Sequence, residues 1–136
     1  RTFMGMEARA STFPVRMPES PEGWITNSAR RGQIEQTPAP IVGWVTAERG
    51  FIQLTQTALP LDEAVRNIDV HPRDLDRTID VAGRQVEVYH SEETDVRDLW
   101  AVDMGDARLL FSGAGTEEEF ETLIESTVTS DPLPTS

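Results

Sequence analysis

The chain of 136 residues contains no cysteine and no lysine. Without cysteine it can have no thiol nucleophile, no thiolate ligand for zinc and no disulfide bond. All twelve basic residues are arginines. Without lysine, the chain can form neither a Schiff base with a carbonyl substrate nor the lysine contact of a phosphate-binding P-loop. Several common classes of enzyme site are therefore excluded.

Long apolar runs are also missing. No stretch approaches the roughly 18 consecutive apolar residues that a membrane-spanning helix needs. The sequence begins with Arg1 rather than methionine, and we expect an upstream segment, with any membrane anchor, to have been removed.

Positive charge is scarce: 24 acidic residues face 12 arginines, which gives a net charge of −12. Nucleic acids are bound by cationic surfaces that release counterions from phosphates, and anionic lipids likewise attract basic segments. We therefore expect no nucleic-acid partner and no direct docking on a membrane surface. The excess charge favours solubility, and an acidic docking face is the alternative that remains open.

The length and the 38% hydrophobic content are typical of one globular domain. We expect a single α+β domain over residues 1–130 and a flexible tail over residues 131–136. Hydrophobic periodicity predicts helices at 2–12, 60–68 and 116–128, and strands at 24–28, 41–46, 51–56, 78–81, 85–90, 96–103 and 109–112. In the first helix, Phe3, Met6 and Ala10 fall near one face, which is the expected apolar face, and Glu7 and Arg9 fall on another. Residues 37–40 are expected to be a connection.

Short turns between consecutive strands predict an antiparallel sheet, which the helices would flank. Residues 109–112 are continuously apolar, and this is typical of a central strand covered on both faces. Thr116 followed by Glu119 is the pattern of a capping box at the start of the last helix. The neighbouring glutamates suit the positive end of that helix better than they suit a calcium loop. The core side of the helix is expected to be Phe120, Leu123 and Ile124.

Trp24, Arg30 and Arg31 are candidates for binding a partner. Trp44 and Trp100 are expected in the core, whereas Trp24 is either a core residue or an anchor for a partner. Arg30 and Arg31 form a basic pair that would contact an acidic partner or a glycan, unless they are simply a solvated loop.

The two histidines do not indicate a catalytic or metal site. His71 lies near Asp69, Asp74 and Asp76, but a metal needs several ligands that converge from well-ordered elements. His90 is followed by acidic residues, yet none of the nearby serines occupies a nucleophile elbow. We therefore predict no catalytic residue, no metal ligand and no cofactor, and we do not expect an enzyme.

Several structural motifs together resemble the actinobacterial domain of unknown function 4245. They are Pro18 to Trp24, Ser28 and Ala29, Trp44 to Thr46, Phe51 to Gln56, Ala82 and Gly83, and Phe111 to Gly115 with the acidic helix after it. The resemblance implies a short protein with one N-terminal transmembrane helix and an extracytoplasmic domain. The order of elements is also similar to the PsbP-like α/β/α sandwich, a fold that implies an accessory, non-catalytic role in membrane assemblies.

From this resemblance we expect a non-enzymatic, extracytoplasmic interaction or accessory domain of an actinobacterial cell-envelope membrane protein. Its partner would be an envelope protein or polymer, and its only attachment to the membrane would be the missing N-terminal helix. The alternative is a domain that binds a small ligand, a lipid or a glycan, between the sheet and the helices.

Overall fold

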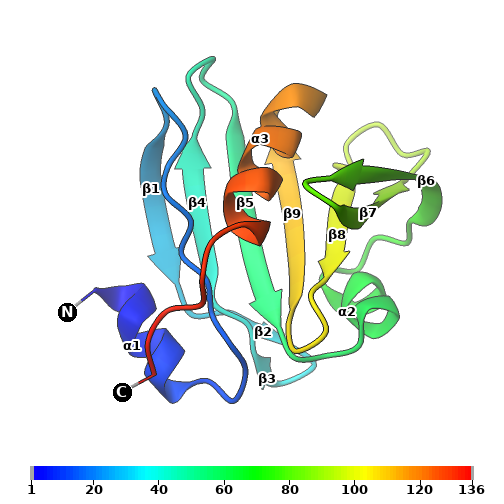
Figure 1. Cartoon of the computed structure of the whole chain (residues 1–136). Coiled ribbons are helices and arrows are strands. Elements are labelled where there is room, and N and C mark those ends of the chain that lie inside the picture. Colours follow the sequence, from blue (N-terminus) through cyan, green and yellow to red (C-terminus); the bar gives the residue numbers. More distant parts are fainter. Residues whose placement is uncertain (1, 136) are drawn as a thin grey trace.

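The computed structural model describes residues 2–135, which form an α+β domain with an antiparallel sheet (Figure 1). Its helices are α1 (Phe3–Ala10), α2 (Leu61–Asn67) and α3 (Glu117–Val128). The seven strands of the large sheet are β1 (Ile25–Arg30), β4 (Ile41–Val45), β5 (Phe51–Thr57), β6 (Asp74–Val81), β7 (Arg84–His90), β8 (Leu99–Asp103) and β9 (Arg108–Ala114). A separate hairpin consists of β2 (Gln33–Ile34) and β3 (Thr37–Pro38). The predicted fold class is confirmed.

The strand order of the large sheet is β1-β4-β5-β9-β8-β7-β6, and every pair in it is antiparallel. After β5 the chain passes through α2 to the far edge strand β6. It then returns strand by strand to β9, which pairs with β5 at the centre of the sheet. The prediction of a central last strand is confirmed.

Side-chain alternation along the central strands builds two apolar layers, one on each face of the sheet. Leu109 and Phe111 belong to the layer that includes residues of α1 and α3, whereas Leu110 belongs to the layer that includes residues of α2 and the β2–β3 hairpin. Trp44 and Trp100 lie in the first layer with no more than 2% of their surface exposed. Their predicted place in the core is confirmed.

Helix α3 begins with the predicted capping box and lies across the sheet (Figure 1). The Thr116 hydroxyl accepts a hydrogen bond from the Glu119 N–H at 3.1 Å, and the Glu119 carboxylate accepts one from the Thr116 N–H at 2.9 Å. The helix buries Phe120, Leu123 and Ile124 as expected, and the Phe120 ring stacks on Trp100 with centroids 5.0 Å apart.

Two local predictions were wrong. In α1 the buried residues are Met4, Glu7 and Ala8. Met6 is 46% exposed and Ala10 is exposed, because Glu7 turns inward to an ion pair and takes the face that Met6 was expected to occupy. Part of the predicted connection at 37–40 is strand β3, since Thr37 and Pro38 pair with β2.

The end of the chain is attached to the segment before β1. The N–H of Leu133 donates a hydrogen bond to the Val15 carbonyl at 2.7 Å, and Leu133 packs against the core. Nearby, Arg16 donates through Nε to the Ser130 carbonyl at 3.2 Å. Flexibility of residues 131–136 stays a prediction, and Ser136 lies outside the described residues.

Candidate functional site

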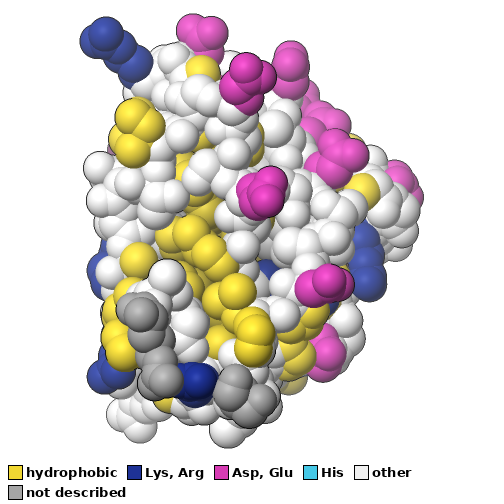
Figure 2. All heavy atoms as spheres, turned by 60° about the vertical axis from the view of Figure 1, so that its left-hand side comes forward, with side chains coloured by type: hydrophobic (Ala, Val, Ile, Leu, Met, Phe, Trp, Pro, Cys, Tyr) yellow, Lys and Arg dark blue, Asp and Glu magenta, His cyan; other side chains and the backbone are white. Residues whose placement is uncertain are grey.

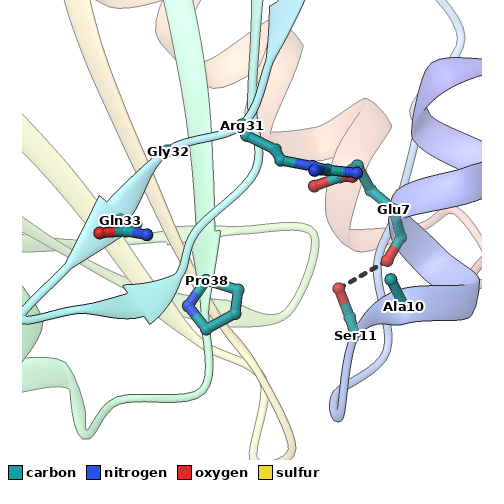
Figure 3. Close-up of a pocket in the computed structure, with 7 residues that line it drawn as sticks. All are labelled: Glu7, Ala10, Ser11, Arg31, Gly32, Gln33 and Pro38. Carbon is teal, nitrogen blue, oxygen red and sulfur yellow. Dashed lines mark hydrogen bonds and ion pairs between the residues drawn. The ribbon is translucent and has the colours of Figure 1, made fainter.

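A cavity of about 660 Å³ opens between α1 and the β2–β3 hairpin, at the end of β1 (Figure 3). Ala10 and Ser11 form the wall on the helix side. Gln33 and Pro38 form the opposite wall, and Arg31 reaches across from the strand side towards Glu7. The volume is within the range of pockets that hold small ligands or peptide side chains.

Close backbone packing holds the hairpin wall in place. The Ala39 N–H donates to the Gly32 carbonyl at 2.8 Å. A Cβ atom on Gly32 would lie 2.6 Å from the Ala39 carbonyl oxygen, so only glycine fits at this point. Arg31 therefore leaves β1 at a constrained position directly beside the cavity.

The turn of this hairpin is strained. Glu35 and Gln36 have φ values of 51° and 67°, a left-handed conformation that non-glycine residues seldom adopt. The turn is held by Thr37, whose hydroxyl donates to the Ile34 carbonyl at 2.6 Å, and by Asn67 of α2, which donates to the Glu35 carboxylate at 3.0 Å. A strained backbone persists only where the surrounding structure holds it in place, and such positions cluster at binding and active sites.

An ion pair between a buried acid and an exposed base spans the cavity. Arg31 Nε donates to Glu7 Oε2 at 3.0 Å, and the side chains are 78% and 7% exposed respectively. The Ser11 hydroxyl donates to the Glu7 carbonyl at 2.6 Å and so closes the end of α1. Because the carboxylate is buried and the guanidinium is not, Glu7 anchors Arg31 at the mouth of the cavity.

The N-terminal part of the chain, which supplies most of the cavity lining, is less acidic than the remainder. Residues 2–34 contain four arginines and three glutamates, whereas residues 35–136 contain seven arginines and 21 acidic residues. Figure 2 shows acidic side chains along the upper and right-hand parts of the face that it presents, and a band of hydrophobic side chains down its middle. The charged residues that line the cavity are Arg31 and Glu7, so the lining itself carries no net charge, whereas the rest of the protein is strongly acidic.

The predicted partner-binding residues are divided between the two ends of β1. Arg31 lines the cavity and Arg30 is exposed beside it. Trp24 precedes the other end of the strand, about 20 Å away at about 3.3 Å per residue, and packs half-buried against the core. Sequence reasoning missed Glu7, because nothing in the pattern of α1 shows that a residue 24 positions later supplies its partner.

Both histidines contact acidic residues of the loop before β8. His90 Nδ1 lies 2.7 Å from Asp98 Oδ1, and His71 Nδ1 lies 3.9 Å from Glu93 Oε2. The hydrogen bond with Asp98 raises the pKa of His90 above its ordinary value of 6.5, and the charges of nearby carboxylates add to this effect.

Asp69, near His71 in the sequence, binds Arg73 instead, with a shortest distance of 3.0 Å. Between residues 2 and 135, no group of three or more histidine, aspartate or glutamate side chains is placed to hold a metal ion.

The described residues include no helix that is long and apolar enough to cross a membrane. No curated protein and no solved structure matches the chain, so the similarity to PsbP-like proteins remains a prediction from the sequence. A family model described as "Protein of unknown function (DUF4245)" matches residues 1–127. The chain therefore belongs to the DUF4245 family.

Proposed function

We propose that this chain is a non-enzymatic binding domain, and that it binds an envelope protein or polymer through the cavity between α1 and the β2–β3 hairpin. The observation that carries the proposal is the position of Arg31. Its guanidinium is held at the mouth of a 660 Å³ cavity by a buried carboxylate, yet most of the side chain is exposed. An arginine that is oriented before binding loses little conformational entropy when a partner arrives.

We further propose that the domain belongs to a cell-envelope membrane protein of an actinobacterium and lies outside the cytoplasmic membrane. The support is the family membership together with what the resemblance implies, namely one transmembrane helix upstream of Arg1. Protease added to intact spheroplasts should then digest the domain. Protection until the cells are lysed would place it in the cytoplasm and reject this location.

The binding proposal is tested by capture of partners with the full-length protein. Wild type, Arg31→Ala and Arg84→Ala are expressed in the native host, crosslinked and purified. Arg84 is a matched control because it is an exposed arginine in β7, away from the cavity. We expect wild type and Arg84→Ala to retain the same partner and Arg31→Ala to lose it. Equal recovery by all three proteins, or no specific partner, would contradict the proposal.

A small-ligand carrier is the second candidate function, because the cavity volume also suits a lipid headgroup or a sugar. It makes a different prediction. Native mass spectrometry of the domain purified from its host would show an added non-protein mass, and this mass would disappear in Arg31→Ala.

A further inference from the structure

We propose that the group recognised in this cavity is the free carboxylate of a peptide chain, and that the outer edge of the Arg31 guanidinium binds it. Because the cavity is also the site of the proposed function, this ligand class rests on that proposal. It adds the chemistry of the ligand, which family membership does not supply.

The hydrogen bonding of Arg31 leaves its outer edge available. Only Nε is engaged, by Glu7 at 3.0 Å, and within residues 2–135 the terminal nitrogens Nη1 and Nη2 have no protein partner. Those two nitrogens present parallel N–H groups that match the two oxygens of a carboxylate. A ligand can therefore add a bidentate contact without displacing Glu7.

The presence of Glu7 selects the charge of the ligand. Its buried carboxylate already balances the charge of Arg31, so the site binds a single negative charge mainly through the hydrogen bonds of the guanidinium. A doubly charged phosphate would be repelled by Glu7 more strongly than a singly charged carboxylate would be. A carboxylate is the better fit.

The walls of the cavity suit a peptide with small side chains. Ala10 and Pro38 give apolar contacts from opposite sides. Within residues 2–135 the side-chain amide of Gln33 has no hydrogen-bond partner. The Ser11 hydroxyl donates to the Glu7 carbonyl and can still accept a hydrogen bond. An amide and a hydroxyl can together satisfy the N–H and C=O groups of a bound peptide unit. An acyl chain would leave this polar lining without a partner.

The test uses the 136-residue chain and two probes that differ in one group. N-acetyl-trialanine with a free C-terminus is compared with the same peptide ending in a carboxamide, and inorganic phosphate is the third probe. Binding is followed by NMR shifts of backbone amides, with each probe raised to tens of millimolar. Arg31→Lys keeps the charge but loses the paired N–H groups, and Arg30→Ala is the matched control beside the site.

We expect the free acid to give saturable shifts at residues 31–33. The carboxamide and Arg31→Lys should each weaken binding by about tenfold or more, while Arg30→Ala changes it by about twofold or less. Equal binding of acid and carboxamide, tighter binding of phosphate, or no saturable shift would overturn the inference. If partner capture still depends on Arg31 in any of those cases, the binding proposal stands and only the carboxylate assignment fails.

Discussion

Glu7 is buried and Arg31 is exposed, and their side chains meet with Oε2 and Nε 3.0 Å apart. The pair joins α1 to the segment that leaves β1, although the two residues are 24 positions apart in the chain. Within residues 2–135 the Glu7 carboxylate pairs with Arg31 and with no other basic side chain, whereas the exposed guanidinium is solvated by water as well. The two partners are therefore expected to respond differently to substitution.

Arg31→Ala should lower the free energy of unfolding by about 1–2 kcal/mol, because it leaves the Glu7 carboxylate buried without its charged partner. The value is below that of a fully buried pair, since water screens the exposed guanidinium. Adding Glu7→Gln should recover part of the loss by removing the buried charge. Urea unfolding of the two single variants and the double variant measures this coupling. A double variant whose loss equals the sum of the single losses would show that the pair does not couple.

Phe120→Ala should lower the free energy of unfolding by about 3–5 kcal/mol, because it removes a buried ring that stacks on Trp100. Thr122→Ala is the control on the exposed side of the same helix and should change stability by about 0.5 kcal/mol or less. Thermal and urea unfolding give both values. A loss below about 1 kcal/mol for Phe120→Ala would mean that α3 does not pack as described.

The elements that could be predicted from the sequence carry their signals locally. The capping box of Thr116 and Glu119 and the helical spacing of Phe120 and Leu123 depend on neighbours in the chain, and Trp44 lies within an apolar strand sequence. Their prediction is confirmed for this reason. The family was also indicated by local motifs and is confirmed.

The site could not be predicted in the same way. The β2–β3 hairpin turns at Glu35 and Gln36, which lack the glycine or asparagine that normally indicates such a turn. The burial of Glu7 depends on a contact 24 residues away. The passage of the chain through α2 to the opposite edge of the sheet is likewise a tertiary feature. Arg31 was a candidate as an exposed base, but its cavity depends on the hairpin and on the buried Glu7.

Replacing Glu35 and Gln36 by Asn and Gly should stabilise the protein by about 1–2 kcal/mol. Both residues have positive φ, which asparagine and especially glycine adopt at lower cost. The gain outweighs the exposed hydrogen bond that Asn67 donates to Glu35. Ala82 in the β6–β7 turn also has positive φ and lies far from the cavity, so Ala82→Gly should stabilise the protein for the same reason. Unchanged or lower melting temperatures would show that the hairpin is not strained. If the strained hairpin shapes the cavity, the replacement of Glu35 and Gln36 should alter peptide binding, whereas Ala82→Gly should not.

The contact between His90 and Asp98 should make stability depend on pH. The hydrogen bond with Asp98 raises the pKa of His90, so folding favours the protonated imidazole. The stabilisation is then complete below the unfolded value of about 6.5 and is lost as the pH rises through the higher folded value. Glu92 and Asp76 also act on this histidine, and Asp74 lies opposite it in the β6–β7 register.

Asp98→Asn should lower the pKa of His90, and it should flatten the dependence of unfolding free energy on pH between about 6 and 8. NMR titration of the imidazole and urea unfolding at several pH values measure the two effects. Glu48→Gln is the control, because it removes the same single negative charge at an exposed position in the β4–β5 turn. It should leave the pKa of His90 and the pH dependence of unfolding unchanged. A His90 pKa that does not respond to Asp98→Asn would contradict the account of this contact.

The central claim is that the domain contacts its partner at the cavity between α1 and the β2–β3 hairpin. Site-specific photo-crosslinking in the native host tests it most directly, with the photoreactive residue placed at Gln33 in the cavity wall or at Thr122 on the exposed side of α3. We expect a discrete crosslinked product from position 33 that disappears when Arg31→Ala is added, and no such product from position 122. A product from position 122 with none from position 33 would contradict the claim.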